Sequence, residues 1–243
     1  MEIHYQEFDN IMEHYQEAKK YTLDNADYFA NKKAEKTTYS TPSLLLGLHT
    51  PSLLLNIGYS GAYKKGRKLT SPGNRPDYFS YEYDIDGNLI RITDHGDSSK
   101  FFCCIFGQNG FEWAIPIYRY KDHYCAYPYY SHATKWDNTG RVSTFIRINN
   151  AEMWIEEYTY PLELQSVAIC KKWYYVPNLS HTSKDKSITE TGSPAQLWVY
   201  KLDITNPKKI TGKMIESYEY DVSAYRQNPP VLPAPQIHTK ISD

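Results

Sequence analysis

Histidine and cysteine are the side chains of this sequence best suited to bind a metal or activate a nucleophile, and two short segments bring such groups together. His123 and Cys125 lie two residues apart on an expected strand, where they would share a face as two metal ligands can. Residues 94–97, Asp-His-Gly-Asp, follow another expected strand and could form an acid–base cluster. No second ligand pair supports the first segment, and Asp and Gly are common turn residues. A packed histidine beside a buried cysteine, and a polar turn, are the favoured interpretations.

Motifs that identify an enzyme from sequence do not occur. The chain has no glycine-rich dinucleotide loop, no phosphate-binding P-loop, no nucleophile elbow and no H-E-x-x-H zinc helix. A Cys–His pair could still assemble from distant positions, but four cysteines and eight histidines single out no combination. We therefore predict no catalytic residue, no metal site and no cofactor, and a protein that is not an enzyme. An enzyme whose site is built from dispersed residues remains an alternative.

The segment from 151 to 165 mixes acids with aromatic residues and contains no lysine or arginine. Aromatic anchors beside acidic side chains suit a basic protein partner. The candidate partner-binding residues are Glu152, Trp154, Glu156, Glu157, Tyr158 and Tyr160. The alternative is that the aromatic residues are core and the acids its rim, because aromatic strand residues are usually buried.

The charge balance bears on the class of partner. The 243 residues include 27 lysines and arginines against 28 aspartates and glutamates, for a formal net charge of −1. A net charge this close to zero argues against a nucleic-acid-binding protein. The most apolar stretch, residues 44–57, is too short to cross a bilayer and is broken by Pro51. We therefore expect neither nucleic acid nor a membrane as a partner.

The N-terminus and the cysteines indicate the compartment. The first five residues have neither the basic nor the apolar region of a secretory signal. The four cysteines form no C-x-x-C pair, which fits free thiols in a reducing environment. The sequence predicts a cytoplasmic protein.

Periodicity predicts an α+β fold that is mainly β. Residues 2–36 place apolar side chains at helical spacing and predict two helices, the second from 26 to 36 with Asp24 or Asn25 as its cap. From residue 78 the period becomes two, and turns such as Asp-Gly-Asn and Asn-Gly separate eight or nine strands, among them strands over 123–130, 142–148 and 167–176. We expect the N-terminal helices to pack on a large antiparallel meander sheet, with an all-β fold as the alternative. Pro116, inside the strand 111–117, predicts an edge or a bulge there.

The predicted organisation is a single domain over 1–221. It comprises a helical part at 1–58, a basic loop at 59–76 and an antiparallel meander at 78–221, followed by a proline-rich tail at 222–243. Within the helical part, Thr-Pro-Ser-Leu-Leu-Leu occurs twice, from residues 41 and 50. Each copy predicts a short helical turn with the threonine as its cap.

One hairpin carries a family resemblance. Residues 81–92, Tyr-Glu-Tyr-Asp-Ile-Asp-Gly-Asn-Leu-Ile-Arg-Ile, resemble one YD repeat, the hairpin unit of RHS-type proteins. Residues 136–141, Trp-Asp-Asn-Thr-Gly-Arg, resemble a degraded second copy, and residues 202–206 a third without the glycine. In structural terms, the motif consists of a strand, an aspartate that caps the following turn, and a Gly or Asn at positive φ in that turn.

A tyrosine-rich antiparallel protein with such a motif resembles the immunity proteins of bacterial polymorphic toxin systems; 24 residues here are tyrosine. Immunity proteins of this kind bind and neutralise a cognate toxin domain. The resemblance implies a non-enzymatic protein that blocks a toxin domain by occlusion. A carbohydrate-binding β-sheet module, whose tyrosine and tryptophan rings stack on sugars, is a further alternative.

Overall fold

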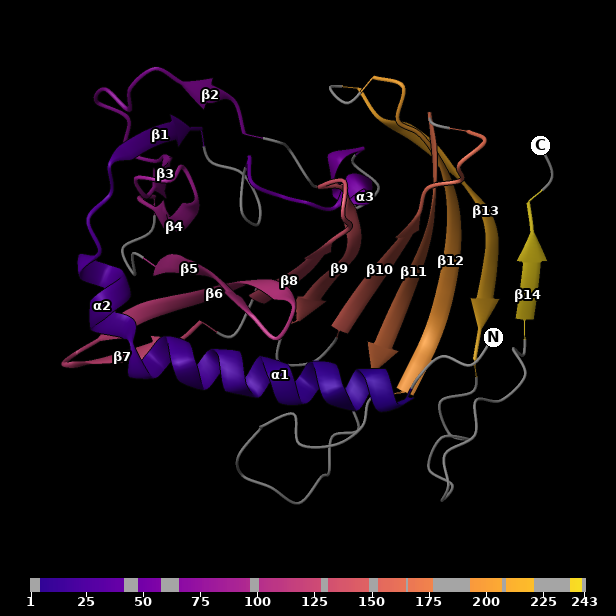
Figure 1. Cartoon of the computed structure of the whole chain (residues 1–243), viewed down its shortest axis with the longest axis horizontal. Coiled ribbons are helices and arrows are strands. Elements are labelled where there is room, and N and C mark those ends of the chain that lie inside the picture. The colour runs from indigo at the N-terminus through magenta and orange to yellow at the C-terminus, as the bar shows by residue number, and fades with distance from the viewer. Residues whose placement is uncertain are drawn as a thin grey trace. The chain divides into compact units, whose positions relative to one another are not determined.

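The computed structural model describes most of the chain. The described residues are 5–41, 48–57, 66–96, 101–127, 131–148, 153–164, 166–176, 193–206, 209–220 and 237–241. Strands predominate over helices among them, and every strand pair is antiparallel (Figure 1). The fold is α+β and mainly β, as the periodicity predicts.

The N-terminal part is less helical than predicted. Helix α1 covers Tyr5–Asp24, and helix α2 covers only Ala26–Asn31. The predicted continuation to residue 36 is wrong, because strand β1 (Lys36–Ser40) pairs with a later strand there. Asn25 precedes α2 but does not cap it; its side-chain amide donates instead to the carbonyl of Tyr21 at 2.8 Å.

The second Thr-Pro-Ser copy forms the short helix α3 (Leu53–Asn56). Its cap is Ser52, whose hydroxyl accepts a hydrogen bond from the backbone N–H of Leu55 at 3.0 Å, and not the predicted threonine. Most of the first copy lies outside the described residues, as do Lys64 and Lys65 of the predicted basic loop. The described end of that loop contains the two-residue strand β2 (Lys68–Leu69), which pairs with β1.

The chain divides into two compact units, a division that the sequence did not predict. One unit is residues 15–134, and the other is residues 1–14 with 135–243. We call them the 15–134 unit and the 135–243 unit. The prediction of one domain over 1–221 stays a prediction.

In the 15–134 unit, the hydrogen-bonded order is β2-β1-β3-β4-β5-β6. The later strands are β3 (Phe79–Tyr83), β4 (Leu89–Asp94), β5 (Phe101–Gln108) and β6 (Phe111–Tyr120). Two strands share the far side of β6: β7 (His123–Ala126) and β8 (Ser131–Trp136). The sequence predicted one strand over 123–130 and no separate β8.

Pro116 lies inside β6, which is neither an edge strand nor bulged at this position. On one side β6 pairs continuously with β5, and Pro116 lies opposite Cys103. On the other side β8 pairs with 112–114 and β7 with 117–120, so the proline falls where one partner strand gives way to the next. The carbonyl of Pro116 still accepts the backbone N–H of Tyr127 at 2.8 Å, and the missing N–H is tolerated because neither β7 nor β8 pairs with residue 116.

The helices pack on the β5–β6 hairpin of this unit, as predicted. The ring of Tyr15 lies 6.2 Å from that of Trp113, and Phe29 of α2 lies 5.6 Å from Phe106. The guanidinium of Arg91, on β4, donates to the carbonyls of Phe29 and Ala30 and so satisfies the end of α2. Buried residues Phe79, Tyr81, Ile92, Cys103, Ile105 and Ala114 form a second core cluster, against which Leu48 packs.

The 135–243 unit is a meander, and Figure 1 shows its strands side by side in chain order. The strands are β9 (Val142–Ile148), β10 (Met153–Thr159), β11 (Val167–Val176), β12 (Ser193–Asp203), β13 (Thr211–Glu219) and β14 (Ile237–Lys240). Strands β9 and β11 have the predicted bounds. Strand β14 lies within the predicted proline-rich tail and pairs with β13.

The meander buries large side chains on both of its faces. Trp173 and Leu197 are buried on one face, and Cys170 and Tyr200 on the other. Neighbouring strands therefore shield one another's aromatic rings, which is how a tyrosine-rich sheet buries apolar surface on both sides.

The buried hydroxyl of Tyr81 provides a stability test in the 15–134 unit. Tyr81 is 2% exposed, and its oxygen accepts the backbone N–H of Leu48 at 2.8 Å and lies 3.1 Å from the Ser40 hydroxyl. We expect Tyr81→Phe to lower the free energy of unfolding by roughly 1–3 kcal/mol, because it leaves a buried donor unsatisfied. Urea denaturation measures the change. The control is Tyr83→Phe on the same strand, whose hydroxyl bonds to no described residue; an equal loss in both variants would contradict the assignment.

Candidate functional site

The hairpins that resemble YD repeats share one turn geometry. In the first, the carboxylate of Asp84 accepts backbone N–H bonds from Asp86 and Asn88, and Gly87 has φ of 82°. In the second, Asp137 accepts N–H bonds from Thr139 and Arg141, each at 2.9 Å, and Gly140 has φ of 79°. The spacing of aspartate and glycine is the same in both. The local prediction of a capped turn with a glycine at positive φ is confirmed.

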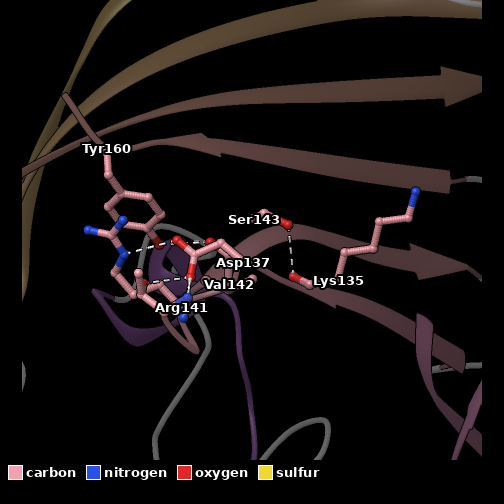
Figure 2. Close-up of polar contacts among 7 residues, drawn as sticks. Lys135, Asp137, Arg141, Val142, Ser143 and Tyr160 are labelled. Carbon is pink, nitrogen blue, oxygen red and sulfur yellow. Dashed lines mark hydrogen bonds and ion pairs between the residues drawn. The ribbon is translucent and has the colours of Figure 1, made fainter. Parts of the chain in front are cut away.

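Tyr160, a predicted partner-binding residue, is tied to the second hairpin. Figure 2 shows its hydroxyl directed at the backbone of Val142, to whose carbonyl it donates at 2.7 Å. The guanidinium of Arg141 lies 4.1 Å from the centre of its ring and also donates to Asp137 at 3.0 Å. Burial raises the pKa of Tyr160 to about 12. Tyr160 therefore anchors the turn before β9 to the end of β10.

The predicted acids do not form an exposed strip. Glu156 is 3% exposed, and the buried hydroxyl of Tyr158 donates to its carboxylate. Glu157 points to the opposite face of β10, where it accepts a 2.9 Å hydrogen bond from the indole N–H of Trp173. Glu152 lies outside the described residues. The two described acids of β10 are thus used inside the unit, whereas Glu163, beyond the end of β10, is exposed.

Trp154, the remaining predicted residue, belongs to a half-exposed cluster of rings and cations. We name this cluster the aromatic–cation ladder; it consists of Arg147, Trp154, Lys172, Tyr174 and Trp198. The ring of Trp154 stacks on Tyr174 at 4.4 Å and 28°, and on Trp198 at 5.8 Å and 17°. The ammonium of Lys172 and the guanidinium of Arg147 lie 4.6 and 5.3 Å from the Trp154 ring centre. All of its members are partly accessible to solvent.

The pairing of strands β9 to β12 brings the residues of the ladder together. Trp154 on β10 lies directly opposite Arg147 on β9 and Tyr174 on β11. Lys172 lies opposite Trp198 on β12, two residues along from Tyr174. Because directly opposed side chains project on the same face, residues from four strands meet on one face in two adjacent rows.

The electrostatics of the ladder are positive. Burial lowers the pKa of Lys172, against the attraction of Glu156, which lies opposite it on β10. The indole N–H of Trp154 is shielded from solvent and donates to no residue that the structure describes. Aromatic rings are electropositive at their edges, and here the ring faces are already occupied by one another and by cations. Arg147, Lys172 and the opposed Glu156 together give this part of the sheet face a formal charge of +1.

The histidine and cysteine candidates do not combine into a reactive site. Burial raises the pKa values of the Cys103, Cys104 and Cys170 thiols, which opposes thiolate formation. His123 is exposed and lies against the Tyr120 ring, and Cys125 is half-buried. No group of three or more His, Cys, Asp or Glu side chains suited to a metal occurs among the described residues.

His95 has a polar partner that the sequence did not reveal. Its Nε2 lies 2.9 Å from the hydroxyl of Ser80, and its ring stacks on Tyr78 at 4.2 Å. Ser80 is only 2% exposed, so a substrate has no access to its hydroxyl. The carboxylate of Asp94 accepts the N–H of Gly96 at 2.8 Å, which is the geometry of the polar turn favoured by the sequence; Asp97 lies outside the described residues.

Comparison with known proteins gave no family model, no curated protein and no solved structure that matches this chain. Separately, no helix within the described ranges is both long and apolar enough to cross a membrane.

The sequence analysis identified Trp154 but missed its neighbours Arg147, Lys172, Tyr174 and Trp198. The strands that carry them were recognised, so cross-strand pairing was the available signal. The Asn-Asn sequence at 149–150 predicts a turn between two antiparallel strands, and alternation along each strand would then have placed a cation beside Trp154.

The Asp137 turn gives a pH-dependent prediction. The Thr139 hydroxyl and the backbone N–H of Arg141 hold the pKa of Asp137 well below its usual range. A carboxyl with a depressed pKa stabilises the fold above its unfolded pKa of about 3.9, and this contribution is lost as the pH falls. Asp137→Ala should therefore lower stability at pH 7, and its deficit relative to the parent chain should shrink below about pH 4.

Urea unfolding of both chains at pH 7, 5 and 3 measures this deficit. Asp122→Ala serves as the control, because that exposed turn carboxylate accepts no hydrogen bond from a described residue. A deficit for Asp137→Ala that stays constant from pH 7 to pH 3 would show that the charge does not stabilise the turn.

Proposed function

We propose that this chain is a non-enzymatic protein-binding protein whose partner contacts the aromatic–cation ladder. The observation that carries the proposal is the partly exposed stack of Trp154, Tyr174 and Trp198 with Arg147 and Lys172 beside it. Tryptophan, tyrosine and arginine are the residues that most often dominate the energetics of protein interfaces. The stack is held in register by hydrogen-bonded strands, so little ordering remains to be done on binding.

The partner surface that fits the ladder is acidic. Glu156 and Glu157 are engaged with Tyr158 and Trp173, whereas Lys172 makes no ion pair with a described residue. A carboxylate from a partner would pair with the partly exposed ammonium of Lys172. This charge is the reverse of the basic partner expected from the sequence of β10.

The biological role that we propose is that of an immunity protein, which neutralises a cognate bacterial toxin domain by occlusion. The role is supported by the sequence resemblance and by the confirmed geometry of the two capped turns. The buried thiols and the inaccessible Ser80 are consistent with a protein that acts by binding. Occlusion requires only that the bound surface cover the partner's site.

The test begins with capture of the partner from the source organism on the immobilised chain. The captured protein is identified by mass and purified, and its affinity is measured for the parent chain and for Trp154→Ala and Lys172→Gln. We expect Trp154→Ala to weaken binding by about 30-fold, which corresponds to roughly 2 kcal/mol at an interface hot spot. Lys172→Gln should weaken it less and should reduce its salt dependence.

The matched control is Trp136→Ala, since Trp136 is also exposed in the 135–243 unit, on β8, and is not part of the ladder. Circular dichroism checks that every variant is folded. If the ladder variants bind as well as the parent, the site is wrong. If the captured protein is harmless when produced alone, the protein-binding function stands and the immunity role fails.

Carbohydrate binding is a second candidate, favoured by the stacked rings of Trp154 and Tyr174. Sugar stacking needs an open ring face, however, and the faces of Trp154 are occupied by Tyr174, Trp198 and two cations. We therefore expect a glycan array to give no hit for the parent chain. A hit that disappears in Trp154→Ala and persists in Trp136→Ala would favour the carbohydrate function instead.

A further inference from the structure

A pocket lies in the 135–243 unit where β12 ends and β13 begins. It has a volume of about 340 Å³ and is lined by Val167, Lys201, Leu202, Asp203, Thr211, Gly212 and Lys213. Val167, Asp203 and Thr211 are directly opposed across three strands, and Lys201 and Lys213 form the next row on the same face. Leu202 and Gly212 lie between these rows and contribute backbone, because alternate residues project to the other face. The size suits one small ligand.

Two lysines face each other across this pocket. Lys201 pairs directly with Lys213 in the β12–β13 register, which puts their Cβ atoms about 5 Å apart. Like charges at directly opposed positions destabilise a strand pair. Lys201 is exposed and forms no ion pair or hydrogen bond with any described residue.

The one acid of the pocket is committed elsewhere. Asp203 accepts the backbone N–H of Thr205 at 2.9 Å and also the Thr205 hydroxyl, and these bonds lower its pKa. Its carboxylate is therefore turned into the β12–β13 loop. Because this carboxylate keeps its negative charge, the two lysines and Asp203 give the pocket lining a formal charge of +1, with the Thr211 hydroxyl as a further donor at the strand end.

We infer that this pocket binds a small oxyanion, the phosphate or carboxylate group of a small molecule, between Lys201 and Lys213. Two ammonium groups from opposed strands can bind one oxyanion from two sides. The negative charge of the bound group then offsets the repulsion between the two lysines. Val167 provides a small apolar surface for the body of the ligand. The site lies on β11–β13 and requires neither the ladder nor the proposed protein partner.

The test uses the full chain, labelled with ¹⁵N, at constant ionic strength maintained with sodium chloride. Inorganic phosphate, phenyl phosphate and acetate are titrated separately while the amide signals of Gly212 and Lys213 are followed. We expect saturable shifts confined to the pocket, and a loss of affinity of about tenfold in Lys201→Gln, which corresponds to one charge-assisted hydrogen bond. Lys240→Gln, an exposed lysine on β14 in the same unit, should leave the affinity unchanged.

The three probes separate the sources of the oxyanion. Tighter binding of phenyl phosphate than of inorganic phosphate identifies an organic phosphate, equal binding identifies the free ion, and preference for acetate identifies a carboxylate. Shifts that follow total salt and do not saturate would overturn the proposal, as would equal affinity in the parent chain and Lys201→Gln.

A second variant tests the charge argument without any ligand. Lys201→Glu replaces a like-charged pair with an opposite-charged pair, so it should raise the unfolding temperature by about 1–3 °C while abolishing phosphate binding. A lower unfolding temperature in this variant, with phosphate binding retained, would show that the two lysines do not form the site.

Discussion

The direct opposition of side chains across antiparallel strands is the constraint on which the rest of this structure depends. Once β10 pairs with β9 and β11, Trp154 is fixed beside Arg147 and Tyr174, and Glu156 is fixed beside Lys172. The same rule sets Lys201 against Lys213 at the other side of the meander. Neither arrangement requires a loop to adopt a special conformation. Both follow from register, which is in turn held by the backbone ladder and by capped turns such as that of Asp137.

Register also explains why the tyrosine-rich composition produces a packed sheet. A strand with large side chains on both faces can bury them only if neighbouring strands offer rings at opposed positions. Trp173 and Tyr175 do so on one face of β11, and Cys170 is covered on the other. Polar atoms inside these layers are paired locally, as Tyr158 is with Glu156 and Trp173 with Glu157. The Tyr158 hydroxyl and the Trp173 indole N–H thus donate hydrogen bonds to the acids of the same sheet.

The sequence predicted features that depend on residues close together in the chain, and it missed those that depend on residues far apart. Turns are local, so the Asp84 and Asp137 hairpins were found from residues four apart, and the strands β9 and β11 were bounded correctly. Strand β1 was missed because its pairing with β3 joins residues 39 to 47 positions apart, which no local pattern reveals.

The candidate site was only half predicted for a similar reason. Residues 152–160 were treated as one strip, although alternation along a strand separates Glu157 from Trp154 and Tyr158. The burial of Glu156 depends on the hydroxyl of Tyr158 and on the neighbouring strand β11, and so does the position of Lys172 over Trp154. Composition along β10 alone contains none of this information. The three strands around β10 supply every other member of the ladder.

Net charge is a poor guide to the surface of this protein, because its acids and bases are used differently. Asp84, Asp137 and Asp203 cap turns, and Glu156, Glu157 and Glu216 accept hydrogen bonds from tyrosine or tryptophan. Lysines lack acceptor capacity and cannot serve either purpose. On β10 the acids Glu156 and Glu157 are thus engaged within the sheet, while the side chain of Lys172 forms no ion pair with a described residue. The acidic partner proposed for the ladder rests on this difference between acids and bases.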